Sequence, residues 1–184
     1  IEEKPGPQGN VPGERYSPTQ PYSAGMPGIG NETLTESDMW GATPFDQLMC
    51  RIRFKSSRYD GIFTPPGLDT ALQYPGSLGG LNWGGASVDP TTDLLYVNDL
   101  RLGLYHYLVP AKDIPAGLGS SEGMGIVVQK GLPYGSMRQR LMSPLGVPCQ
   151  APPFGTLSAI NLKTHKLVWQ VPVGTVQDTG PLGI

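Results

Sequence analysis

The chain has 184 residues and a net charge of −2, and 38% of its residues are hydrophobic, so one domain with a buried core is expected. Only 15% of the residues are charged and no basic stripe is present, which excludes a typical nucleic-acid-binding surface. No run of about 18 apolar residues occurs, so we expect no membrane-spanning segment here. The 26 glycines and 20 prolines punctuate strand-like runs, which favours a mainly β fold with many turns over disorder.

The N-terminal residues are rich in proline and glycine. We expect residues 1–32 to form an extended connecting arm with little regular structure, followed by one β-rich domain at 33–184. The sequence begins with Ile1 rather than Met and stops at Ile184 without a tail. We therefore expect it to be a piece of a longer protein.

One short helix is predicted at about 43–52. Thr43 is a good N-cap, Pro44 suits the first helical position, and Asp46 places a negative charge in the first turn. Apolar side chains then recur at helical spacing: Phe45, Leu48, Met49 and Ile52.

The two cysteines, Cys50 and Cys149, lie far apart in the sequence and form no CxxC pair. With only two histidines in the chain, we expect no zinc site. A disulfide and two separate thiols both remain open.

Strands are predicted wherever β-forming residues alternate between turn signals. The predicted strands are 83–88, 94–99, 102–109, 158–162 and 167–171. Residues 110–130 are expected to form a long glycine-rich excursion, and residues 134–153 to be irregular. The last two strands flank a polar turn and predict a hairpin.

This hairpin has a characteristic spacing. Ala159 is followed by the side-chain acceptor Asn161, then by Thr164 and Trp169, which resembles the tryptophan-docking repeat of quinoprotein dehydrogenase propellers. Asn161 and His165 depart from the usual Asp and Gly of that repeat. The resemblance implies that Trp169 is buried between adjacent blades.

No self-contained catalytic set is visible, since the chain lacks a GxSxG elbow, a P-loop, a GxGxxG strand–helix turn and an HExxH motif. The candidates for binding are polar and aromatic residues beside glycines. Asn82 and Trp83 precede two glycines that permit close backbone approach, and Asn98 lies at a strand end. An aromatic face and an amide suit a planar ligand rich in carbonyl and carboxylate groups. From the residues alone, a core tryptophan and a turn-capping asparagine are favoured.

Six segments in order resemble the membrane-bound quinoprotein glucose dehydrogenases, which use pyrroloquinoline quinone (PQQ). They are 38–43 (DMWGAT), 45–48 (FDQL), 58–66 (RYDGIFTPP), 83–90 (WGGASVDP), 146–149 (GVPC) and 158–164 (SAINLKT). The likeness runs from about residue 12 to the end. Relatives that oxidise quinate or shikimate share this architecture.

The resemblance implies part of an eight-bladed β-propeller, about two to three blades with long loops. The parent protein would be anchored through N-terminal membrane helices that this chain lacks, and would face the periplasm at the bacterial inner membrane. It would oxidise an aldose, glucose to gluconolactone, with PQQ beside Ca²⁺, and pass the electrons to ubiquinone.

The resemblance assigns Asn98 to PQQ contact, with Trp83 and Asn82 as nearby candidates. No residue here matches the family's catalytic Asp, its Lys or its calcium ligands, and ubiquinone is expected to be handled beyond Ile184. The isolated chain is therefore expected to be inactive and to supply cofactor wall only. We also expect its uncovered strand edges to favour self-association.

Two alternatives remain. The first is a quinate- or shikimate-type PQQ dehydrogenase. The second is a non-enzymatic propeller scaffold that uses the same tryptophan repeat.

Overall fold

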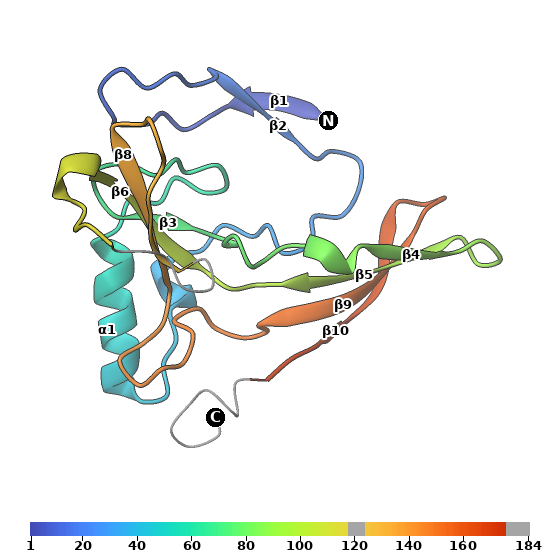
Figure 1. The fold of residues 1–184 in the computed structure, drawn as a ribbon. Coiled ribbons are helices and arrows are strands. Elements are labelled where there is room, and N and C mark those ends of the chain that lie inside the picture. Colours follow the sequence, from blue (N-terminus) through green and yellow to red (C-terminus); the bar gives the residue numbers. More distant parts are fainter. Residues whose placement is uncertain (118–123, 176–184) are drawn as a thin grey trace.

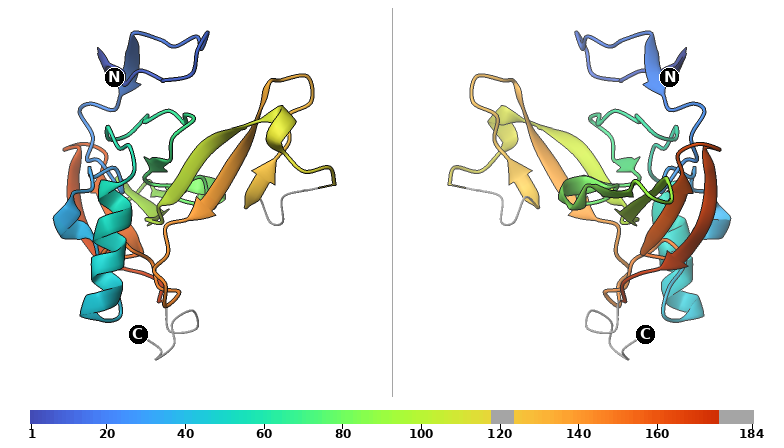
Figure 2. Two further views of the ribbon diagram at one scale, coloured as in Figure 1. Left: turned by 90° about the vertical axis from the view of Figure 1, so that its left-hand side faces the viewer. Right: turned by 90° about the vertical axis from the view of Figure 1, so that its right-hand side faces the viewer.

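The computed structural model describes residues 1–117 and 124–175. Their fold is mainly β: two four-stranded antiparallel sheets, a separate two-stranded hairpin and one α-helix (Figure 1). The two large sheets extend in different directions from a shared region, and the small hairpin stands apart from both (Figure 2). The predicted mainly β class with one short helix is confirmed.

The first sheet has the order β3-β6-β8-β7. Its strands are β3 (Ala71–Gln73), β6 (Leu104–Pro110), β8 (Tyr134–Arg140) and β7 (Gly125–Val127). The helix α1 (Pro44–Lys55) lies beside this sheet (Figure 1). As the sequence predicts, Thr43 caps it, with Thr43 Oγ1 accepting from the Asp46 N–H at 3.2 Å. The helix runs three residues further than predicted.

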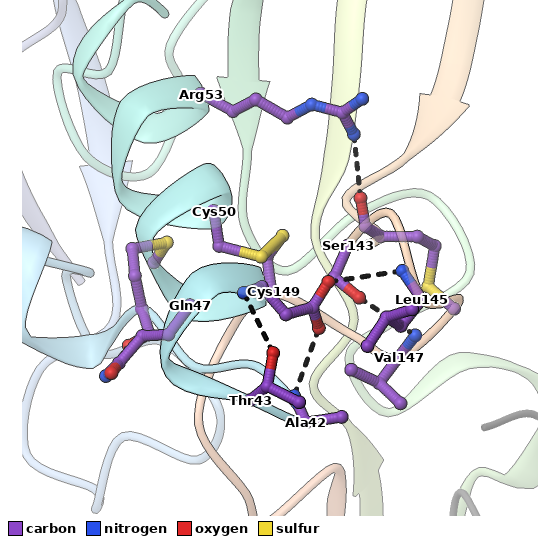
Figure 3. Close-up of a disulfide and its surroundings, with 12 residues drawn as sticks. Ala42, Thr43, Gln47, Cys50, Arg53, Ser143, Leu145, Val147 and Cys149 are labelled. Carbon is purple, nitrogen blue, oxygen red and sulfur yellow. Dashed lines mark hydrogen bonds between the residues drawn. A yellow bond between two sulfur atoms is a disulfide. The ribbon is translucent and has the colours of Figure 1, made fainter. Parts of the chain in front are cut away.

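A core forms between α1, the first sheet and the loops around them. Its buried members are Leu34, Met39, Cys50, Leu72, Tyr74, Tyr105, Leu141 and Cys149. A disulfide joins Cys50 of α1 to Cys149, which lies 99 residues later in the chain (Figure 3). The structure thus settles the alternative that the sequence left open.

The second sheet has the order β10-β9-β5-β4. Its strands are β4 (Ala86–Asp89), β5 (Leu94–Leu100), β9 (Gly155–Asn161) and β10 (Lys166–Pro172). The predicted hairpin is β9–β10. Asn161 Oδ1 accepts from the Lys163 and Thr164 N–H groups at 3.0 and 2.8 Å, so Asn closes the turn as Asp would. His165 adopts a φ of 56°, the left-handed region that explains why Gly is usual there.

Trp169 lies on β10, the outer strand of the second sheet, where every residue is exposed. Its side chain is 37% exposed, and its ring packs 6.0 Å from the ring of Tyr96 on the same sheet. The described residues therefore cover only one side of Trp169. Its burial between blades stays a prediction.

Two predictions about strands differ from the structure. The strand predicted at 83–88 starts only at Ala86, because a 3₁₀ turn, η2 (Asn82–Gly84), precedes it and Gly85 has a φ of 61°. The region predicted to be irregular from 134 begins with β8, which pairs with β6 and β7. The sequence of β8 is rich in polar residues and shows no clear strand pattern, but its hydrogen bonds to β6 on one side and β7 on the other place it in the sheet.

The arm and the glycine-rich excursion also contain regular structure. The arm holds the hairpin of β1 (Glu2–Pro5) and β2 (Thr19–Tyr22), and a 3₁₀ turn, η1 (Glu36–Asp38), follows it. The excursion includes the 3₁₀ turn η3 (Ala111–Asp113) and β7, while residues 118–123 lie outside the described residues. The division of the chain at residue 32 stays a prediction.

Candidate cofactor-binding wall

The three binding candidates come together at the end of β5. The backbones of Gly80 and Leu100 exchange two hydrogen bonds, of 2.8 and 3.1 Å, which fix the loop carrying Asn82 and Trp83 against the strand that carries Asn98. η2 then lies over this strand. A Cβ added to Gly84 would lie 2.8 Å from Asn98 Oδ1, so a larger residue at this position would have to displace the Asn98 side chain.

Trp83 is 98% exposed, so the described residues do not bury it in a core. Among residues 1–117 and 124–175 the core interpretation has no support, and the role of Trp83 stays a prediction. A tryptophan normally buries much of its large apolar ring, so complete exposure leaves a flat aromatic face without cover from the described residues.

Asn98 is also exposed. No hydrogen bond recorded among residues 1–117 and 124–175 uses its side-chain amide, so within this part of the chain Asn98 caps no turn. Its amide offers two donors and an acceptor. Gly84 of η2 lies against this side chain, so the turn that carries Trp83 and the strand that carries Asn98 present an exposed aromatic ring and an exposed amide on neighbouring elements.

Charged residues that the sequence analysis missed lie behind this surface. Asp99 and Arg101 are buried, and Arg101 Nε donates to Asp99 Oδ2 at 2.7 Å. The guanidinium also donates to Glu32 Oε1 at 3.1 Å and to Thr156 Oγ1 at 3.4 Å, and Thr156 Oγ1 donates to the second oxygen of Asp99. We call Asp99, Arg101, Thr156 and Glu32 the polar network. The available signal in the sequence was a pair of opposite charges, Asp99 and Arg101, that directly follows Asn98 at the end of a predicted strand.

Two other titratable residues, His106 and Asp46, make hydrogen bonds within the fold. His106 Nε2 lies 2.6 Å from Ser136 Oγ, and burial, with a contribution from Arg138, lowers the pKa of His106. Asp46, buried in the first turn of α1, accepts from the N–H groups of Ala42 and Leu145 at 3.0 and 3.1 Å (Figure 3). Neither arrangement offers a site open to a substrate.

Two kinds of feature are absent from the described residues. In the ranges 1–117 and 124–175, no three His, Cys, Asp or Glu side chains gather closely enough to hold a metal ion. No helix in these ranges is long and apolar enough to span a bilayer.

Comparison with known proteins identifies the family. The model of the PQQ family, described as "Glucose/ethanol/alcohol dehydrogenase, beta-propeller domain", matches residues 1–184. The chain is 57% identical to a quinate/shikimate dehydrogenase (quinone) of Acinetobacter baylyi, over 100% of the chain and 24% of that protein. It is 42% identical to a quinoprotein glucose dehydrogenase of Escherichia coli, over 97% of the chain and 23% of that protein.

A glycerol dehydrogenase large subunit of Gluconobacter oxydans is 40% identical, over 100% of the chain and 27% of that protein. The chain thus spans about a quarter of the length of these relatives. No solved structure matches it. Because the family model covers every residue and the fold has two four-stranded antiparallel sheets, the chain belongs to the PQQ-dependent glucose/ethanol/alcohol dehydrogenase family and forms part of its β-propeller domain.

Proposed function

We propose that this chain is part of a PQQ-dependent dehydrogenase and forms part of the wall that binds PQQ. The observation that carries the proposal is the exposed Trp83 on η2, a turn that lies against the strand carrying the exposed Asn98. When bound, PQQ supplies the two-electron acceptor of the reaction. The missing Cβ of Gly84 supports the arrangement, because it lets η2 lie close to the Asn98 side chain.

The chain's own residues bind and orient the cofactor. The Trp83 ring offers a face against which a planar group packs, and the amide of Asn98 hydrogen bonds to oxygen atoms at its edge. Asn82, which has a φ of 44°, opens the 3₁₀ turn η2 that carries Trp83. The catalytic base and the Ca²⁺ ligands are proposed to lie in other parts of the full-length protein.

Quinate or shikimate is the substrate class that we propose. The resemblance of the sequence favoured glucose, but the relative named for quinate and shikimate is 57% identical and the relative named for glucose is 42% identical. The comparison therefore supports the quinate alternative better than the glucose prediction. Glucose remains the second candidate, since its relative also matches nearly the whole chain.

A quinone is the proposed electron acceptor, because the name of the first relative includes one. Ubiquinone and a location at the periplasmic face of the inner membrane rest on the family resemblance. Fractionation of cells expressing the full-length protein tests the location, and a purely cytosolic protein would contradict it.

The decisive assay compares quinate and glucose. The full-length apo-protein is loaded with PQQ and Ca²⁺, and dye-linked oxidation of each substrate is measured. We expect oxidation of quinate or shikimate well above that of glucose. Glucose oxidation without quinate oxidation would overturn the proposed substrate class. If no tested substrate were oxidised in a PQQ-dependent reaction, the result would favour a non-enzymatic scaffold.

Asn98→Ala tests the wall itself. Loss of one amide contact costs about 0.5–1.5 kcal/mol of PQQ binding free energy, measured by calorimetric titration of the full-length apo-protein. Asn10→Ala is the control, since Asn10 is exposed on the arm and bonds to Asp69 at 2.6 Å. Equal PQQ affinity of the Asn98 and Asn10 variants would remove Asn98 from the site.

A further inference from the structure

The end of β5 carries two kinds of residue on opposite faces. Side chains alternate along a strand, so Asn98 is exposed toward the proposed wall while Asp99 is buried behind it. Leu100 follows, and its backbone holds Gly80, two residues before Asn82. Whatever fixes residues 99–101 therefore fixes both the strand that carries Asn98 and the loop that carries Trp83.

The polar network joins the end of β5 to two distant segments of the chain. Arg101 joins Asp99 of β5 to Glu32 of the arm, 69 residues away, and to Thr156 of β9, 55 residues away. A fourth connection comes from Gln150 Nε2, which donates to the Arg101 carbonyl at 2.6 Å. Asp99 and Arg101 flank Leu100, so the connections hold the strand on both sides of the residue that anchors the loop.

The packing around Asp99 leaves it little freedom. Asp99 is 2% exposed, and a Cβ added to Gly30, whose φ is 66°, would lie 2.5 Å from Asp99 Oδ2. The arm backbone therefore closes directly over the carboxylate. A buried ion pair usually contributes little stability compared with apolar packing. A role in fixing geometry gives a physical reason for these charges at the strand end.

We propose that Asp99, Arg101 and Thr156 are positioning residues, which hold Asn98 and the Trp83 loop in the arrangement that binds PQQ. This inference rests on the proposed function. It also gives the arm a part in the site, because Gly30 covers Asp99 and Glu32 contacts Arg101.

The first test compares two buried aspartates in the full-length apo-protein. Asp99→Asn keeps the shape and removes the charge that Arg101 faces. Asp46→Asn makes the same change in the first turn of α1, where the N–H groups of Ala42 and Leu145 contact the carboxylate. Calorimetry with PQQ and Ca²⁺ measures affinity, and thermal unfolding measures stability. We expect Asp99→Asn to weaken PQQ binding about tenfold, as loss of a supporting partner commonly does. Asp46→Asn lowers the Tm and leaves the affinity unchanged.

A second pair of variants decides the matter if Asp99→Asn does not fold. Thr156→Ser keeps the hydroxyl that contacts Asp99 and Arg101, whereas Thr156→Val replaces it with a methyl group. We expect Thr156→Ser to retain PQQ affinity and Thr156→Val to lose it. Equal affinity of the two Thr156 variants, or an equal affinity loss in the Asp99 and Asp46 variants, overturns the inference.

Asn98→Ala separates this inference from the proposed function. If Asn98→Ala weakens PQQ binding and the Asp99 and Thr156 variants do not, the proposed PQQ-binding wall is supported and the positioning role of the polar network is contradicted. If Asn98→Ala has no effect on PQQ binding, the proposed wall is contradicted, and so is the inference that rests on it.

Discussion

The two large sheets of this chain differ in how completely the described residues bury them. The first sheet and α1 share a core that includes Leu72, Tyr105 and the disulfide. In the second sheet, β10 is exposed along its whole length, and only the last residue of β4 is partly covered. One region is packed within this chain, and the other has apolar strands that residues 1–117 and 124–175 leave uncovered.

The exposed strands of the second sheet have the composition of an interface. The large apolar residues of β10 are each at least one-third exposed: Leu167, Val168, Trp169 and Val171. In a propeller, neighbouring blades cover such faces, and repeat units gain much of their stability from their neighbours. We therefore expect the second sheet to depend on the rest of the protein more than the first does. Without that cover, the isolated chain is expected to self-associate.

Trp169→Ala in the full-length protein gives the largest expected effect on this comparison. If a neighbouring blade buries the indole, the substitution costs about 3–5 kcal/mol of unfolding free energy, measured by denaturant unfolding. Trp83→Ala is the matched control in protein free of PQQ, because Trp83 lies in a turn and is 98% exposed within this chain. A Trp169 variant as stable as the Trp83 variant would show that β10 has no covering neighbour.

The double substitution Cys50→Ser with Cys149→Ser tests the self-contained region. The disulfide closes a long loop between α1 and the first sheet's flanking segment, and its loss is expected to cost about 2–5 kcal/mol. Unfolding followed by circular dichroism measures this change. Arg53→Ala is the control, since it removes one hydrogen bond from α1 to the Met142 carbonyl, of 2.8 Å (Figure 3).

Arg53→Ala should cost about 1 kcal/mol or less, because this hydrogen bond is exposed. If the cysteine variant lost no more than the arginine variant, α1 would be held by packing alone.

High pH should weaken the core of the first region. Burial raises the pKa of Tyr74 and of Tyr105 from 10.0 to about 12, because the phenolate is poorly solvated inside the fold. This contribution to stability is complete below pH 10.0 and is lost as the pH rises to about 12. Phenolate absorbance and unfolding are measured together in wild type and in Tyr105→Phe. Equal alkaline destabilisation of both proteins would contradict the role of Tyr105.

The smallest effect concerns the β4–β5 turn of the second sheet. Hydrogen bonds from Thr91 and then Thr92 lower the pKa of Asp89 from 3.8 to about 2. Any stabilisation from this turn is present above pH 3.8 and is lost as the pH falls to about 2. Thr91→Val should raise the pKa of Asp89 toward 3.8, as followed by NMR titration. Thr164→Val, in the other turn of this sheet, should leave it unchanged; an unmoved pKa in the Thr91 variant would refute the assignment.

Local signals predicted the elements that depend on neighbours in the sequence. Thr43, Pro44 and Asp46 define the start of α1 within four positions, and Asn161 with His165 closes the β9–β10 turn within five. Such elements are encoded by short-range hydrogen bonds and backbone preferences, which a sequence displays directly. Their boundaries depend on packing, which explains why α1 continues to Lys55.

The candidate wall was predicted only in part. Asn82, Trp83 and Asn98 were named from their residue types beside glycines and from the family resemblance, and the structure brings the three together. The strand expected around Trp83 is a 3₁₀ turn, because Gly85 reverses the backbone there. The exposure of Trp83 could not be read from its surroundings in sequence, since it depends on which elements cover the turn.

The sequence by itself determined the β class, the helix start, the hairpin and the family resemblance, because each rests on spacing between nearby residues or on motifs in order. Tertiary structure alone decided the pairing of Cys50 with Cys149, the central place of β8 and the buried contacts of Arg101. Those features join residues up to 99 positions apart. Such contacts form only when the whole chain has folded, so no local pattern records them.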